Sequence, residues 1–172
     1  MIQQHGPVLG VDIGGTNMRF GLVDEDARLT GFEQLSTREV FAPGSDPAAK
    51  LAEAIRGYCV RQAGGKLPLA VSIGFPSTIN RARTVVVQTP NIPTVPDHFE
   101  VVEALQAALG VRVFINRDVN NLLLFDLDDL GVTARGCVAG IYFGTGIGNA
   151  IMVDGKILLG RNGVAAELGH LP

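Results

Sequence analysis

A carboxylate and a glycine-rich turn lie close together near the start of the chain, within residues 8–23 (VLGVDIGGTNMRFGLV). The turn consists of Gly14, Gly15, Thr16 and Asn17. Glycines let the backbone approach a ligand closely because they carry no Cβ atom, and successive N–H groups can surround phosphate oxygens. Asp12 precedes the turn and could hold Mg²⁺ through water, since this cation prefers oxygen ligands and keeps much of its hydration. The residues therefore fit a phosphate and magnesium site, and they also fit a plain β-hairpin.

A second glycine-rich turn follows a predicted strand at residues 136–143. Its candidate phosphate-binding positions are Gly144, Thr145, Gly146 and Gly148. The turn is not a dinucleotide fingerprint, because its third glycine comes one position early and a predicted strand at 149–153 follows in place of a helix. Because Thr follows Gly in both turns, we favour two phosphate loops that face each other across a cleft over two flexible glycine turns.

Asp118 lies where a predicted strand at 111–115 passes into a predicted helix. The spacing alone favours a helix N-cap, which is a common use of Asp. A carboxylate here could instead act as a general base that takes a proton from an attacking hydroxyl. Arg117 next to it cannot lose its own charge, and it either keeps the Asp118 carboxyl ionised or faces solvent.

Two further polar residues, Glu167 and His170, stand three positions apart near the end of the sequence. On a helix this spacing would place both on one face. The pair could bind hydroxyl groups, or His170 could be one ligand of a metal. One His cannot make a zinc site, and no cysteine cluster follows within the sequence.

The elements that must position these residues alternate between strands and helices. After the first hairpin the patterns predict a strand at 29–37, a helix capped by Asp46 and ended at Gly64, strands at 69–73 and 84–87, a helix at 97–109, the strand at 111–115 and a helix from 118. This order predicts an α/β sheet with helices packed on it. Ligands of such sheets bind at the carboxyl ends of the strands, and Asp12, Gly74, Asn91 and Asp118 all fall at or just after such ends.

The composition is that of a globular protein with a real core, since 47% of the 172 residues are apolar and 18% are charged. The length suits one domain, or one domain and part of another. A net charge of −3 and a pI of about 5.5 argue against a nucleic-acid surface. The richest apolar stretch, residues 138–153, is broken by glycines, so we expect no membrane span. With no visible secretory signal, we expect a cytoplasmic protein whose Cys59 and Cys137 are buried, reduced thiols.

Six motifs together resemble the ROK sugar-kinase family, which belongs to the actin-like ATPase superfamily. In chain order they are DIGGTN at 12–17, GFP at 74–76, TPNIP at 89–93, RDVNN at 117–121, GTGIG at 144–148 and ELGH at 167–170. Six motifs in the family's order are far more specific than any one of them. Within the family, APG at 42–44, TPNIP, RDVN and the final GVAAELGHLP resemble the corresponding segments of D-allose kinases.

The resemblance implies an α/β fold of the actin-like ATPase (ribonuclease H-like) type. It divides the chain into an N-terminal lobe at 1–117, which carries the first phosphate loop, and the beginning of a second lobe at 118–172. Family kinases continue well past the last motif, so the chain is expected to be an N-terminal portion. A ROK-type repressor would need a helix-turn-helix segment ahead of the first hairpin, and we therefore expect a kinase.

The implied activity is ATP-dependent transfer of the γ-phosphate to the 6-hydroxyl of a hexose, with D-allose as the expected substrate. Glucokinase, fructokinase and N-acetylmannosamine kinase of the same family are the alternatives, together with a fragment that binds sugar without turnover. ATP and Mg²⁺ are the implied cofactors. A zinc ion and a homodimer are expected only in a full-length form.

The resemblance also implies roles for individual residues. Asp118 matches the catalytic base, Asp12 the residue that helps to hold Mg²⁺, and the two glycine-rich turns the loops around the ATP phosphates. The expected sugar-binding residues are Gly74, Pro76, Asn91, Arg117, Glu167 and His170. His170 also matches the family's first zinc ligand. Two positions depart from the family pattern, because Arg117 stands where Asn is common and Ser77 where Gly is common, and both could reshape the sugar pocket.

Overall fold

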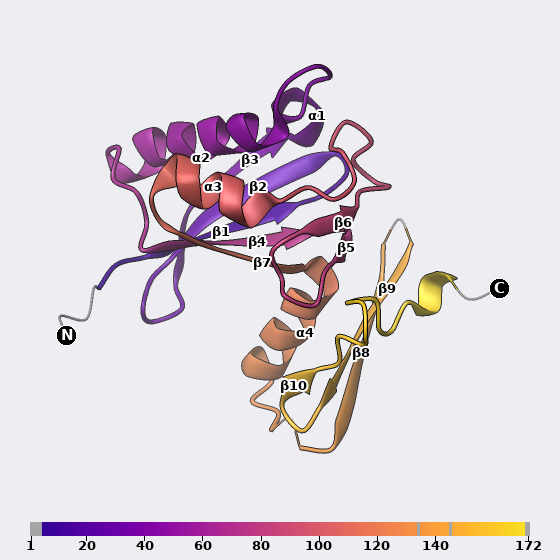
Figure 1. Ribbon diagram of the computed structural model, residues 1–172. Coiled ribbons are helices and arrows are strands. Elements are labelled where there is room, and N and C mark those ends of the chain that lie inside the picture. The colour runs from indigo at the N-terminus through magenta and orange to yellow at the C-terminus, as the bar shows by residue number, and fades with distance from the viewer. Residues whose placement is uncertain (1–4, 134, 145, 171–172) are drawn as a thin grey trace.

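A computed structural model describes residues 5–133, 135–144 and 146–170 (Figure 1). The amino-terminal part is built around one mixed sheet. Strands β1 (Val8–Ile13), β2 (Asn17–Val23) and β3 (Leu29–Ser36) form an antiparallel meander. Strands β4 (Ala70–Phe75) and β7 (Arg112–Arg117) run parallel to β1 and give the order β3–β2–β1–β4–β7. The predicted α/β sheet is thereby confirmed.

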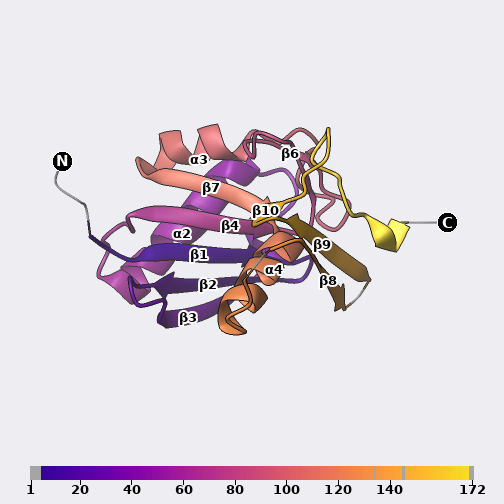
Figure 2. The same cartoon turned by 90° about the horizontal axis from the view of Figure 1, so that it is seen from below.

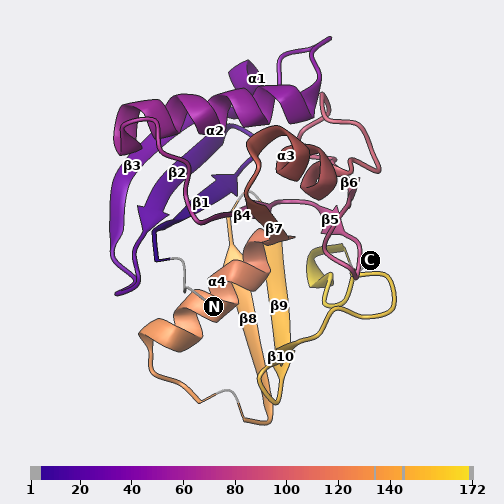
Figure 3. The same cartoon turned by 60° about the vertical axis from the view of Figure 1, so that its left-hand side comes forward.

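Two helices, α2 (Pro47–Ala63) and α3 (Val101–Leu109), cover one face of this sheet (Figures 1 and 3). The core lies between the helices and the sheet. Apolar side chains alternate along the strands, as a sheet with one covered face requires, and those that point to the helices are fully buried. They include Leu9, Ile13, Val71 and Ile73 from the strands and Leu51, Ile55 and Tyr58 from α2.

Helix α2 begins and ends where the sequence predicts. Asp46 is its N-cap and accepts a hydrogen bond from the backbone N–H of Ala48 at 2.9 Å, with Pro47 as the first helical residue. Gly64 ends the helix in the left-handed conformation, with φ 59°. Both signals are local. A capping carboxylate accepts a hydrogen bond from a backbone N–H that has no partner within the helix, and glycine adopts a positive φ without a Cβ clash.

We expect Asp46→Ala to lower the free energy of unfolding by about 1 kcal/mol, because the first turn of α2 loses the acceptor for its backbone N–H. Asp46→Ser keeps an acceptor and is expected to retain most of the stability. Urea unfolding of the three proteins, followed by circular dichroism, measures the difference. An equal loss in both variants would show that the cap contributes nothing.

The segment before α3 differs from its prediction. The helix expected at 97–109 begins at Val101, because Phe99 forms an antiparallel bridge with Val86 through backbone hydrogen bonds of 3.0 and 2.9 Å. His98 has a positive φ of 57°, which no helix accommodates. The bridge extends a small hairpin of β5 (Thr78–Ile79) and β6 (Val86–Gln88). Strand β5 was not predicted, and β6 starts later than expected.

The end of strand β3 was also predicted wrongly. The strand expected at 29–37 ends at Ser36, which caps a short helix, α1 (Thr37–Val40), by accepting from the N–H of Glu39. Both cysteines are free thiols, as expected, and Cys59 is buried, whereas the predicted burial of Cys137 is wrong because this residue is exposed. Burial raises the pKa of the Cys59 thiol.

The carboxyl-terminal part packs one helix on a smaller sheet. Helix α4 (Asp118–Asp129) lies against the antiparallel strands β8 (Cys137–Phe143), β9 (Ile147–Val153) and β10 (Lys156–Ile157), in the order β10–β9–β8. A short 3₁₀ turn, η1 (Leu168–His170), follows. A separate apolar cluster joins the helix to the sheet through Val119, Leu123, Ala150 and Met152. Within the described ranges, no helix is long and apolar enough to cross a membrane.

Candidate functional site

The carboxyl ends of β1, β4 and β7 bring the predicted carboxylates together. In the parallel register Asp12 lies opposite Gly74, which lies opposite Asn116. A methyl group placed on Gly74 would lie 3.6 Å from the Cα of Asp118 and 3.8 Å from Oδ1 of Asp12. Figure 2 shows these strand ends on the side of the sheet where α4, β8 and β9 lie. The predicted convergence of Asp12, Gly74 and Asp118 is therefore present.

Asp118 is the first residue of α4, and the N-cap position belongs to Arg117. The interpretation of Asp118 as the N-cap is thus wrong, although its Oδ1 accepts the N–H of Val119 at 2.7 Å. Burial raises the pKa of the Asp118 carboxyl, and the charges of Asp12 and Glu167 act in the same direction. The Val119 N–H and the Arg117 guanidinium oppose this rise in pKa. A carboxylate with a raised pKa in a site of this kind is suited to accept a proton.

Asp12 is half exposed, and its Oδ2 accepts from Arg19 at 2.9 Å. Mg²⁺ is commonly held by one or two carboxylates and by the phosphates of a nucleotide, and the Asp12 carboxylate fits that donor set. The described part of the chain has no group of three His, Cys, Asp or Glu side chains that could hold a metal, and the zinc ion expected in a full-length form stays a prediction. The His170 side chain lies outside the described residues.

The first glycine-rich turn is fixed by residues distant in sequence. Thr37 is buried, its Oγ donates to the carbonyl of Gly14 at 2.8 Å, and its N–H donates to the carbonyl of Thr16 at 2.9 Å. The N–H of Gly14 donates to the carbonyl of Asn17 at 2.8 Å, so within this turn it closes the hairpin and is not available to a phosphate. The sequence analysis missed Thr37, whose only signal is a hydroxyl at a strand end.

Asn91 lies beside this turn. A methyl group on Gly15 would lie 3.1 Å from the carbonyl oxygen of Asn91, so only glycine fits here without displacing the loop. The Asn91 side chain donates to the carbonyl of Pro76 at 3.2 Å and so joins two predicted sugar-binding positions. Next to Pro76, the Ser77 hydroxyl is buried and has no hydrogen-bond partner among the residues described.

An asparagine network that the sequence analysis missed holds the junction between β7 and α4. Asn116 Nδ2 donates to Oδ1 of Asn121 at 2.9 Å, and Oδ1 of Asn116 accepts from Nδ2 of Asn120 at 3.0 Å and from the N–H of Arg117 at 3.1 Å. Asn120 and Asn121 follow Asp118 inside the helix, where Asn is unfavourable, and this was the available signal.

Arg117 and Glu167, which are far apart in sequence, are in contact. Nη2 of Arg117 lies 2.6 Å from Oε1 of Glu167, and Nη1 donates to the carbonyl of Ala165 at 3.1 Å. Glu167 precedes the 3₁₀ turn η1, so Glu167 and His170 are not part of one helix and the spacing argument for a shared helix face does not apply. The alternative of a solvent-facing Arg117 is also wrong, because its side chain is only 12% exposed.

The second glycine-rich turn joins β8 to β9, so a strand follows it as predicted, although β9 begins at Ile147. Within the turn, the N–H of Gly144 donates to the carbonyl of Gly146 at 2.9 Å. A Cβ atom on Gly148 would lie only 2.6 Å from Cγ1 of Val119, which is too close for two carbon atoms. Close packing against α4 therefore explains why a glycine stands at this position. Thr145 lies outside the described residues.

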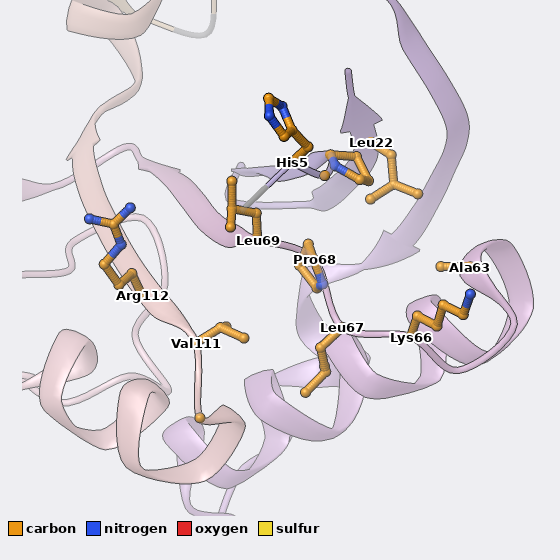
Figure 4. A pocket seen from close by; sticks show the side chains of 12 residues that line it. His5, Leu22, Ala63, Lys66, Leu67, Pro68, Leu69, Val111 and Arg112 are labelled. Carbon is orange, nitrogen blue, oxygen red and sulfur yellow. The ribbon is translucent and has the colours of Figure 1, made fainter. Parts of the chain in front are cut away.

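A pocket opens at the opposite end of the large sheet, where the parallel strands begin (Figure 4). It is lined by residues that include His5, Leu22, Lys66, Leu69 and Arg112. None of the predicted site residues lines it. The candidate site is therefore the cluster at the carboxyl ends of the strands.

The model of the ROK family matches residues 8–172. The chain is 34% identical to a glucokinase of Streptomyces coelicolor and 35% identical to an N-acetyl-D-glucosamine kinase of Photobacterium profundum, over 96% and 94% of its length. A solved structure of a ROK glucokinase from Streptomyces griseus, in complex with glucose and AMPPNP, superposes with a TM-score of 0.78 at 30% identity. It is matched over 96% of this chain and 50% of its own. The chain spans about half the length of these relatives.

Proposed function

The chain belongs to the ROK family, and from that premise we propose that it forms the amino-terminal half of an ATP-dependent hexose kinase. The observation that carries the proposal is the convergence of Asp12, Gly74 and Asp118 at the carboxyl ends of three neighbouring strands. Ligands of α/β sheets bind at such ends. The fold, which is the α/β fold of the ROK kinases and other actin-like ATPases, supports the same activity.

In this proposal Asp118 is the general base. It takes the proton of the hexose 6-hydroxyl while that oxygen forms a bond to the γ-phosphorus of ATP and the bond from the γ-phosphorus to the ADP oxygen breaks. Asp12 would hold Mg²⁺ through water, and this ion neutralises charge on the phosphates when it is bound. Gly15, Thr16 and Asn17 would line the phosphates on one side, and residues 144–148 on the other.

The acceptor site is proposed to lie between Asp118 and the three segments that approach it. The 74–76 corner and Asn91 are joined by the bond from Asn91 to Pro76, which supports a shared role in sugar binding. Glu167 reaches the same region through Arg117. We retain His170 as a sugar ligand in the proposal on the family motif alone.

The names of the relatives bear on the identity of the hexose. The relatives reported above are named as kinases of glucose and of N-acetyl-D-glucosamine, which favours glucose over D-allose. N-Acetyl-D-glucosamine was not among the substrates expected. D-Allose rests only on the short segments quoted from the sequence, with Arg117 among them. We therefore propose a hexose acceptor and place D-glucose first.

The division into lobes at residues 117 and 118 remains a proposal, supported by two separate apolar clusters. One holds the large sheet with α2 and α3, and the other holds α4 with the small sheet. A homodimer remains a prediction for a full-length form. A sugar-binding fragment without turnover is the second candidate, favoured by the half-length match to the relatives.

The test is ATP-dependent phosphorylation of D-glucose, D-allose, D-fructose, N-acetyl-D-glucosamine and N-acetyl-D-mannosamine. It is run on the 172-residue chain and on a form extended to the length of its relatives. We expect the extended form to turn over with Mg²⁺ and to stop when the cation is chelated. Sugar binding by the chain, with no phosphorylation of any hexose by either form, would replace the kinase by the sugar-binding fragment.

A further inference from the structure

Arg117 joins the start of α4 to a segment about fifty residues later. Its guanidinium makes two contacts with that segment, an ion pair to Glu167 at 2.6 Å and a hydrogen bond to the Ala165 carbonyl at 3.1 Å. Its backbone N–H is held by Asn116. Arg117 is thus held both at its backbone and at its guanidinium, and the next residue in the chain is Asp118.

The surroundings make this contact stronger than a surface ion pair. The Arg117 side chain is 12% exposed and that of Glu167 33% exposed, whereas the Arg19–Asp12 pair nearby is about half exposed on both sides. Screening by water weakens exposed pairs, and removal of one partner from a buried pair is costly. The Arg117–Glu167 contact is therefore expected to persist in solution.

The segment around Ala165 and Glu167, which Arg117 contacts, is also held in place by other contacts. The Ala165 N–H donates to the carbonyl of Leu159 at 3.1 Å, and the Leu168 N–H donates to Oδ1 of Asn149 at 2.9 Å. Gly163 packs so closely on the Ile79 carbonyl that a Cβ would not fit. Between these points Ala166 has φ 67°, a conformation that a residue with a Cβ rarely adopts. Because this positive φ is unfavourable, contacts on both sides of Ala166 must hold it, and Arg117 contacts both Ala165 and Glu167.

We propose that Arg117 is a positioning residue that fixes the Glu167 carboxylate beside Asp118 and thereby sets the affinity of the site for its acceptor sugar. The inference deepens the proposed function and rests on it for the identity of the ligand. Arginine suits this role because its planar fork reaches two acceptors at once. Lysine would keep the positive charge but contact the segment at one point only. An uncharged side chain would keep neither the charge nor the contact.

The first experiment measures the held segment without any ligand. Amide hydrogen exchange of the 172-residue chain is compared for wild type, Arg117→Met, Arg117→Lys and Arg61→Met. Arg61 is the matched control, since it pairs with Glu33 between α2 and β3. We expect Arg117→Met to lower the protection of the Ala165 and Leu168 amides about tenfold or more, and Arg61→Met to leave these amides unchanged.

The second experiment measures sugar binding by the same four proteins with D-glucose and D-allose, by isothermal titration calorimetry. Arg117→Met is expected to weaken the Kd of the preferred sugar about tenfold, comparable to the loss of one charge-assisted hydrogen bond. Arg117→Lys should recover part of the affinity, and Arg61→Met should bind like wild type. This partial rescue by a conservative change is not expected of a residue that only stabilises the fold.

The two readouts separate the possible failures. Unchanged exchange in Arg117→Met overturns the inference, because the segment then needs no such partner. Increased exchange with an unchanged Kd also overturns it, because the held segment then has no part in sugar binding. A wild-type chain that binds no sugar, with increased exchange in Arg117→Met, removes the acceptor role of Arg117 and counts against the proposed sugar site, while the ion pair itself stands.

Discussion

Asp118→Asn is expected to lower the rate of hexose phosphorylation about 10²–10⁴-fold in the form extended to the length of the relatives. The amide keeps the shape of the side chain and can still accept the Val119 N–H, but it cannot take a proton from the sugar. Asp128→Asn, on an exposed position of the same helix, is the matched control and should retain wild-type turnover. Near-normal turnover of Asp118→Asn in steady-state assays would remove Asp118 from the role of base.

The same substitution is expected to stabilise the fold at neutral pH. Burial raises the folded-state pKa of Asp118, so folding favours the protonated carboxyl. The stability gained from the protonated form is present below the unfolded pKa and is lost as the pH rises through the folded pKa. Asn carries no charge at any pH. Asp118→Asn should therefore raise Tm at pH 7 and raise it less near pH 4, which differential scanning calorimetry can measure.

The raised pKa of Asp118 also determines the pH at which activity falls on the acid side of the pH profile. The base works only when ionised, so kcat/KM should fall as the pH is lowered through the Asp118 pKa. Because burial raises that pKa, the fall should begin at a higher pH than for an ordinary aspartate. A lower Tm for Asp118→Asn at pH 7, or an acid limb at the usual aspartate value, would contradict the assignment of a raised pKa.

Features fixed by local chemistry could be predicted from the sequence. The cap at Asp46 and the stop at Gly64 depend on neighbouring residues only. The placement of Asp12, Gly74 and Asp118 at one edge follows from a general property of parallel strands, whose carboxyl ends meet on the same side of the sheet. These are the parts of the candidate site that the sequence could place.

Features that depend on the path of the chain could not be predicted. The contact of Arg117 with Glu167 and the two bonds of Thr37 to the first turn join residues that no periodicity relates. The bridge between Phe99 and Val86 shortened a predicted helix because pairing with a distant strand outweighed the local apolar pattern. Helical propensity is weak enough for tertiary contacts to override it.

Gly74 lies at the centre of the proposed site, and one neighbour, Asn121, limits the space for a side chain there. A methyl group there would lie 3.2 Å from Nδ2 of Asn121, closer than ordinary van der Waals contact, as well as 3.6 Å from the Asp118 Cα and 3.8 Å from Asp12 Oδ1. Asn121 must therefore move, and it is bonded to Asn116, which also holds the N–H of Arg117. The displacement would reach the junction that positions Asp118.

We expect Gly74→Ala to lower the turnover of the extended form by less than the roughly 10²-fold effect of a shift of about 1 Å in catalytic groups, because Asn121 need move only slightly to accept the methyl group. Overpacking of a closely packed site should lower the free energy of unfolding by about 1–3 kcal/mol. Gly10→Ala is the matched control in the adjacent strand, where the added methyl would lie 3.6 Å from the Gly21 carbonyl, an ordinary contact. Steady-state kinetics and urea unfolding of both variants separate the two effects. Equal turnover in the two variants would show that the space at Gly74 is not needed for catalysis. A loss confined to Gly74→Ala, in a chain that is still folded, would place the reacting groups around that residue.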